Sequence, residues 1–211
     1  MGYYPIFIEL TERRCLVIGG GAVAERKVEE LLAVGGRVTV ISPTIAEGLR
    51  DLLAQGSIRH VERAYEWGDL VDCELVFAAT DDPEINAAAF REARSRRIWI
   101  NSADDPAHCD FILPGVIRRG DLAVAVSTGG ASPAATRAIR EELEDYFTAD
   151  YARFVQVAGE ARRQLREKSV SVSGTVWNKA LKGDFRRLIR EGRAEEAKKV
   201  LLETLEAGLC A

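Results

Sequence analysis

Short runs of apolar residues alternate with amphipathic segments along the first hundred residues. Runs rich in apolar and β-branched side chains, which predict strands, occupy residues 14–18, 37–41, 58–62, 75–79 and 98–100. Segments in which apolar residues recur every three or four positions, which predict helices, occupy residues 25–34, 45–55 and 84–94. Strands that alternate with helices of this length are typical of an α/β fold with a parallel, doubly wound sheet. A further apolar stretch at 4–10 is expected to be an edge strand or a lead-in.

The pattern changes after residue 110. Apolar runs at 111–117 and 122–126 are joined by a short polar turn, which predicts an antiparallel hairpin. A turn of small residues then leads to Ser132-Pro133, a helix start in which Ser132 is the N-cap and Pro133 the first helical position. That helix is expected to end near residue 147. From residue 151 onward the pattern is helical, with a break at 170–174.

The turn after the first strand carries a glycine motif, Gly19-x-Gly21-x-x-Ala24. Gly19 permits the tight turn, Gly21 lets the backbone approach a phosphate, and Ala24 lets the next helix pack closely on the sheet. The helix that follows and the strand at 37–41 complete a βαβ unit. The motif therefore predicts a dinucleotide site of the Rossmann type, with a plain strand-to-helix turn as the alternative.

The second strand lacks the acidic residue that usually binds the adenosine ribose of NAD. It ends in Ser42-Pro43-Thr44, and the nearest arginine is Arg50. A hydroxyl can bond a ribose, but it does not repel a 2′-phosphate. The residues therefore predict a nicotinamide dinucleotide and leave NAD and NADP both open.

We expect three parts in the chain: a Rossmann-like domain over residues 1–113, a small α+β region over 114–147, and a helical domain over 148–211. The chain has 211 residues, of which 47% are hydrophobic and 29% charged, as in ordinary globular proteins. No apolar run approaches the roughly 20 residues of a membrane span, and the N-terminus does not resemble a signal peptide. The four cysteines are scattered without a CxxC pair, which indicates reduced thiols in a cytoplasmic protein.

Charge is unevenly distributed. Residues 1–150 hold 16 basic and 25 acidic side chains, a net charge of −9, whereas residues 151–211 hold 13 basic and 8 acidic ones, a net charge of +5. The basic part is either a set of solvated helix faces or a positive surface for a polyanionic ligand. Nucleic acid is not expected as a partner, because this part has no recognisable binding motif and little aromatic interleaving.

The loop after the strand at 98–100 gathers candidate chemistry. It carries Asp104, Asp105, His108, Cys109 and Asp110 at the expected cofactor crevice. A carboxylate that faces a nicotinamide can act as a general base or steer a cationic intermediate. Alternatively, these aspartates make only turn hydrogen bonds, and His108 is only a local hydrogen-bonding residue.

Five motifs in chain order resemble those of the precorrin-2 dehydrogenases, the dehydrogenase/chelatase modules of siroheme synthesis. They are Gly19-Gly20-Gly21-x-Val23-Ala24-x-Arg26-Lys27, Ala78-Ala79-Thr80-Asp81-Asp82, Asn101-x-x-Asp104, Phe111-Ile112-Leu113-Pro114 and Ser127-Thr128-Gly129-Gly130-x-Ser132-Pro133. The resemblance covers residues 3–147, and the helical part fits the family's third region more loosely.

The resemblance implies NAD⁺-dependent oxidation of precorrin-2 to sirohydrochlorin, with Fe²⁺ insertion added in some members. It implies a homodimer joined through the central region and an essential aspartate at Asp104. The residues themselves predict no fixed metal site, because Fe²⁺ usually needs several convergent His or carboxylate ligands. The expected cofactor-binding residues are Gly19, Gly21, Ala22, Val23, Ser42, Pro43, Thr44, Thr80 and Asp81. Some members carry a serine where this chain has Thr128, so a role that needs that serine stays open.

Precorrin-2 carries eight carboxylates, which a basic surface would suit. The expected substrate-binding residues are Asn101, Arg118, Thr128, Ser132 and Arg137. Three functions remain open: a dehydrogenase alone, a dehydrogenase that is also a ferrochelatase, and a non-catalytic NAD-binding regulatory module. The last is disfavoured, because such modules normally keep an acidic residue at the end of the second strand.

Overall fold

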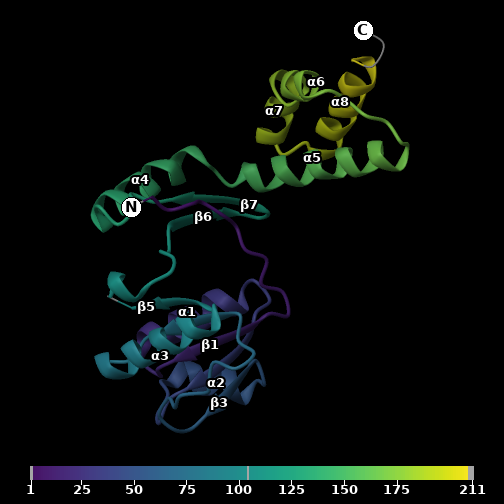
Figure 1. The fold of residues 1–211 in the computed structure, drawn as a ribbon. Coiled ribbons are helices and arrows are strands. Elements are labelled where there is room, and N and C mark those ends of the chain that lie inside the picture. The colour runs from purple at the N-terminus through teal and green to yellow at the C-terminus, as the bar shows by residue number, and fades with distance from the viewer. Residues whose placement is uncertain (1, 104, 209–211) are drawn as a thin grey trace. The chain divides into compact units, whose positions relative to one another are not determined.

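A computed structural model describes residues 2–103 and 105–208. The chain divides into two compact units, Met1–Ile112 and Leu113–Ala211 (Figure 1). This boundary lies beside the end of the expected Rossmann-like domain. The further division at residue 147 stays a prediction.

The first unit is a five-stranded parallel sheet with helices on both faces. Its strands are β1 (Arg14–Ile18), β2 (Arg37–Ile41), β3 (Ile58–Val61), β4 (Leu75–Ala78) and β5 (Trp99–Ser102), in the order β3-β2-β1-β4-β5. Its helices are α1 (Ala22–Leu32), α2 (Glu47–Ala54), α3 (Pro83–Arg96) and a short 3₁₀ turn, η1 (Pro106–His108). The predicted doubly wound α/β fold is confirmed.

Strand β1 lies at the centre of the sheet and is buried on both faces. Cys15 and Val17 pack in the core beneath α1 and α2, whereas Leu16 and Ile18 pack in the core beneath α3. Successive side chains of a strand point to opposite faces. A continuous apolar run is therefore what a two-sided core requires.

Two expected strands differ in the structure. The stretch at 4–10 has no regular secondary structure, and the strand expected from residue 111 begins only at Gly115. The ring of Phe111 packs edge-to-face against Phe77, with 5.7 Å between centroids, so this part of the chain belongs to the core of the first unit. Pro114 has no N–H to donate, which delays the start of pairing.

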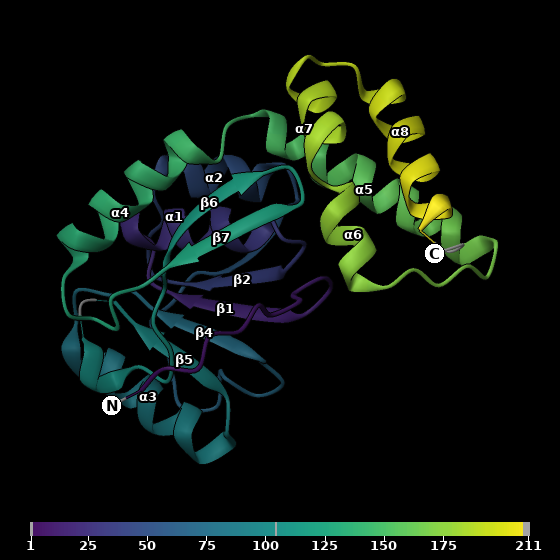
Figure 2. The same cartoon turned by 90° about the horizontal axis from the view of Figure 1, so that it is seen from above.

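Up to residue 208, the second unit contains a two-stranded antiparallel hairpin (Figure 2) and five helices. The hairpin joins β6 (Gly115–Arg119) to β7 (Leu122–Val126), as predicted. Ser132 caps α4 (Pro133–Tyr146) by accepting a hydrogen bond from the N–H of Ala135 at 3.2 Å. The remaining helices are α5 (Asp150–Glu167), α6 (Gly174–Ala180), α7 (Gly183–Arg190) and α8 (Ala194–Ala207).

The helical part buries its own core, to which Val157, Leu165, Phe185, Leu188 and Leu201 contribute. The predicted break lies between α5 and α6, and two further turns separate α6, α7 and α8. In the part of the chain that the structure describes, no helix is long and apolar enough to cross a membrane.

A buried carboxylate ties helix α3 to the loop before β4. Glu92 is fully buried and accepts hydrogen bonds from Tyr65 Oη at 2.5 Å, Gly68 N at 2.8 Å and Arg96 Nε at 2.6 Å. Burial raises the pKa of Glu92, but these three donors outweigh it, so that the pKa lies below its ordinary value. Ionised Glu92 therefore stabilises the fold.

We expect Glu92→Gln to lower the free energy of unfolding by about 2–3 kcal/mol, since hydrogen bonds to a charged group contribute that much. Exposed Glu84→Gln on the same helix is the control and should change it by less than about 0.5 kcal/mol. Because the folded pKa of Glu92 is depressed, its contribution is present above the unfolded pKa and is lost as the pH falls through the folded pKa. Urea unfolding at pH 7 and pH 4 measures both effects; equal costs for the two variants at pH 7 would contradict the stabilising role.

Candidate functional site

The candidate site of the first unit lies at the carboxyl ends of its central strands. The strand order reverses between β1 and β4, where doubly wound sheets bind their ligands. The sheet register pairs Ile18 with Ala78 and Ala78 with Ser102, so the turns after β1, β4 and β5 lie side by side. Ala103 N donates to Ala78 O at 2.8 Å, which continues this contact beyond the strands. These three strand ends therefore form one edge, as the sequence predicts.

Two glycines allow neighbouring backbones to touch. Gly19 has a φ of +121°, and a Cβ there would lie 2.3 Å from Ala79 O. A Cβ at Gly20 would lie 1.9 Å from Thr44 O. Neither position can hold a side chain unless the adjacent loop moves.

Gly21 differs from these two glycines. A Cβ at this position would meet nothing within 4 Å, and Gly21 is the N-cap of α1 with no side chain capping the helix. Ala22 and Val23 are exposed in the first turn, where helical N–H groups lack intrahelical acceptors. Ala24 is fully buried and lets α1 pack against the sheet. The geometry fits a pyrophosphate on the open N-terminus of α1.

The loop after β2 packs directly on the glycine turn. Ala46 N donates to Gly20 O at 2.7 Å, and the buried hydroxyl of Ser42 donates to Thr44 O at 2.7 Å. The Ser42 hydroxyl proton therefore stabilises the loop itself, while Pro43 and Thr44 are exposed at its tip. His60 Nε2 lies 2.9 Å from Ser42 O and supports the same loop from β3, a role the sequence did not reveal.

The turn after β4 is stabilised by an asparagine that the sequence analysis did not single out. Asn86 is buried in α3; its Nδ2 donates to Thr80 O at 2.9 Å, and its Oδ1 accepts from Thr80 Oγ1 at 2.8 Å. The one sequence feature that could have indicated this role is the position of Asn86, a polar amide directly before three alanines. Asp81 is exposed beside this turn, and Asp82 caps α3 by accepting a hydrogen bond from Glu84 N at 2.9 Å.

The loop after β5 is closed by side chains expected to carry chemistry. Asn101 Nδ2 donates to Phe111 O at 2.9 Å, and Cys109 Sγ accepts from Ser102 N at 3.2 Å. Asp110 binds Arg94 at 2.7 Å and accepts from Ile100 N at 3.2 Å. Burial raises the pKa of the Cys109 thiol, which disfavours the metal-binding thiolate.

His108 supports the same loop. Its Nδ1 lies 2.5 Å from Asp105 Oδ2, and its ring packs edge-on against Phe90. The hydrogen bond from His108 lowers the pKa of Asp105. Within residues 2–103 and 105–208, no three His, Cys, Asp or Glu side chains are grouped so as to hold a metal ion. Asp104 lies outside the described residues.

The expected substrate-binding residues of the second unit fall into two kinds. Thr128 Oγ1 accepts from Ser132 N at 3.1 Å and lies 3.0 Å from Thr136 Oγ1, so the hydroxyls of Thr128 and Ser132 are used to shape the turn and cap α4. Arg118 on β6 and Arg137 on α4 are exposed, and neither has an ion-pair partner among the residues that the structure describes.

A family model described as putative NAD(P)-binding matches residues 6–115, just over half of the chain and all of the crevice described above. The chain belongs to this NAD(P)-binding family. A second model, of the central region of sirohaem biosynthesis proteins, matches residues 119–146. The cofactor predicted from the glycine motif is thereby confirmed as a nicotinamide dinucleotide.

Relatives of this NAD(P)-binding chain include the siroheme synthase of Nitrosococcus oceani, 37% identical over 210 residues, which are 99% of this chain and 45% of the relative. Siroheme synthase 1 of Serratia proteamaculans is 38% identical over 208 residues, 98% of this chain and 44% of the relative. The chain thus spans less than half the length of these relatives. A solved structure of SirC, precorrin-2 dehydrogenase, is similar over 97% of this chain and 100% of that one, with a TM-score of 0.73 and 25% identity.

Gly20 and Gly21 should respond differently to alanine. We expect Gly20→Ala to lower the free energy of unfolding by about 3 kcal/mol, because its Cβ would clash with Thr44 O. Gly21→Ala should fold with nearly wild-type stability, yet bind NAD⁺ at least about tenfold more weakly, because its Cβ would enter the space a pyrophosphate needs. Thermal unfolding and calorimetric titration with NAD⁺ measure both effects; wild-type affinity in Gly21→Ala would place the dinucleotide elsewhere.

Proposed function

We propose that this chain oxidises precorrin-2 to sirohydrochlorin with NAD⁺ as the hydride acceptor. The observation that carries the proposal is the open N-terminus of α1 at the strand-order reversal of an NAD(P)-binding fold. The likeness to siroheme synthases and to SirC, precorrin-2 dehydrogenase, supports the choice of substrate.

In this proposal the backbone binds the cofactor. Gly19 and Gly21 form the phosphate turn, and the N–H groups of Ala22 and Val23 point to the pyrophosphate. Pro43 and Thr44 border the adenosine ribose, with the loop held in place by Ser42. Thr80 and Asp81 border the nicotinamide, from a turn held in place by Asn86. Bound NAD⁺ supplies the hydride acceptor.

Asp104 is the proposed proton acceptor. Oxidation removes a hydride and a proton from the tetrapyrrole, so a base must be present at the crevice. The neighbours of Asp104 are anchored there: Ala103 bonds to Ala78, and Asp105 bonds to His108. Asn101 closes the same loop through Phe111. The carboxylates of the substrate are assigned to Arg118 on β6 and Arg137 on α4, the helix that Ser132 caps.

Asp104→Asn should lower the rate of precorrin-2 oxidation at least about 100-fold, because it removes the base. Its affinity for NAD⁺ should stay within about twofold of wild type. Anaerobic NADH formation from enzymatically made precorrin-2, with the sirohydrochlorin spectrum as a second readout, measures the rate. Asp105→Asn, which changes the neighbouring carboxylate, is the control and should keep most of the activity. Full turnover by Asp104→Asn would remove the residue from this role.

Fe²⁺ insertion into sirohydrochlorin is a second candidate reaction, with Fe²⁺ as a substrate. Chelation needs a base for the pyrrole protons, and Asp104 is the group proposed for it. The other candidates are already engaged: His108 and Cys109 bond to neighbouring residues, and Asp110 pairs with Arg94 of α3. Adding Fe²⁺ to the same cuvette after oxidation tests this reaction.

NAD⁺ binding without any oxidation of precorrin-2 would instead favour the non-catalytic NAD-binding regulatory module.

We also propose a homodimer that forms through the hairpin. Ile117 is buried and packs on the side of α4, whereas Val116 and Arg118 alternate with it and are exposed on the opposite face. Among the described residues neither outer edge of this two-stranded sheet is paired. The exposed Val116 and the open edges favour pairing with a second copy.

Val116→Asp should shift the protein from dimer to monomer, because it places a charge on the face proposed to be buried. Val71→Asp, at an exposed valine of the first unit, is the matched control and should leave the dimer intact. Light scattering coupled to size-exclusion chromatography gives the mass, and circular dichroism tests folding. A folded Val116→Asp protein that is still a dimer would refute the hairpin interface.

A further inference from the structure

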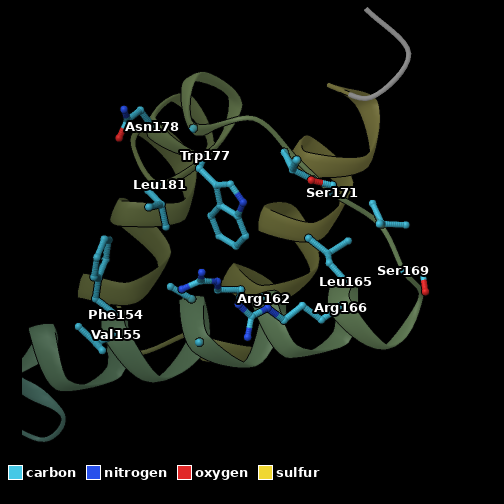
Figure 3. A pocket seen from close by; sticks show the side chains of 15 residues that line it. Phe154, Val155, Arg162, Leu165, Arg166, Ser169, Ser171, Trp177, Asn178 and Leu181 are labelled. Atoms are coloured by element: carbon cyan, nitrogen blue, oxygen red, sulfur yellow. The ribbon is translucent and has the colours of Figure 1, made fainter.

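The helical part of the second unit contains a groove of about 840 Å³ between α5, the loop at 168–173 and α6 (Figure 3). This volume is within the range of roughly 300–1,000 Å³ that is usual for small-molecule sites. Neither the family models nor the residues predicted from the sequence include this groove.

Two cationic side chains of the groove have no carboxylate partner. Arg162 and Arg166 lie one turn apart on α5, are exposed, and make no ion pair among the residues that the structure describes. None of the residues that line the groove is acidic. By contrast, Arg187 and Arg193 of the same bundle both bind Glu191. The groove thus presents two guanidinium groups that are available to an anion.

The indole of Trp177 forms a flat apolar wall in the same groove. Figure 3 shows it between α6 and α5, on the side toward which Arg162 and Arg166 project. Leu165 and Phe154 contribute further apolar surface. An aromatic wall beside unpaired guanidiniums suits a ligand that is flat and carries carboxylates, because rings stack on an indole and carboxylates accept paired hydrogen bonds from arginine.

We propose that this groove binds a conjugated, flat polycarboxylate. We identify this ligand as a tetrapyrrole with carboxylate side chains, and that identification rests on the proposed function. The macrocycle lies against Trp177, and two of its carboxylates bind Arg162 and Arg166. This gives the net positive charge of residues 151–211 a specific role in tetrapyrrole recognition.

The test uses uroporphyrin I, an air-stable tetrapyrrole with eight carboxylates, and the full chain labelled with 5-fluorotryptophan. The chain has three tryptophans, Trp67, Trp99 and Trp177, and Trp177→Phe assigns the third fluorine resonance. We expect saturable ring-current shifts at Trp177 that exceed those at the other two. We expect R162Q/R166Q to weaken binding at least about tenfold. R153Q/R190Q is the control, since it removes two exposed charges of the same bundle outside the groove, and it should bind as wild type does.

Three outcomes would overturn the proposal. They are equal shifts at all three tryptophans, equal weakening in both double variants, and equal competition by benzene hexacarboxylate, an anion without a macrocycle. The last two outcomes would mean that the groove binds anions through its positive charge alone, without specificity for a tetrapyrrole. Precorrin-2 oxidation by the same variants is measured separately. If wild-type protein oxidises precorrin-2 but uroporphyrin leaves Trp177 unchanged, the groove proposal fails while the proposed function stands.

Discussion

The contact between backbones at Gly19 and Gly20 is the constraint on which the cofactor crevice depends. A Cβ at either position would overlap a carbonyl oxygen, of Ala79 in one case and of Thr44 in the other. These contacts bring the turns after β1, β2 and β4 together and leave the N-terminus of α1 open beside them. The proposed phosphate site therefore depends on main-chain geometry and on the lack of side chains at these glycines.

Most polar side chains near the crevice stabilise its loops. Ser42 closes the loop after β2, Asn86 holds the turn at Thr80, and Cys109 bonds to the backbone of the loop after β5. Each bond satisfies a group that would be costly to bury alone. In the proposed reaction, catalysis therefore depends on few groups, which rigid loops hold in place.

The two units differ in what they can offer a ligand. The first presents free N–H groups at the N-terminus of α1, which can bind the pyrophosphate of a dinucleotide. The second has guanidinium groups on the hairpin, on α4 and in the groove of the helical part that have no carboxylate partner among the described residues. The proposed hydride transfer from a polycarboxylate to a dinucleotide would use both kinds of surface.

The sequence determined the elements and the fold class, because apolar periodicity, Asp82, Ser132 and the glycine motif act within a few residues of one another along the chain. It also predicted a dinucleotide cofactor, since the motif, strand and helix are contiguous, and the NAD(P)-binding family bears this out. Only the tertiary structure decided what Ser42, His108 and Cys109 do, because their partners depend on how loops pack. The same holds for Phe111. Its apolar run predicted a strand, but in the structure its ring packs against Phe77 in the core. Neighbouring residues along the chain determine secondary structure. The hydrogen-bond partners of a polar side chain, by contrast, are residues that only folding brings close.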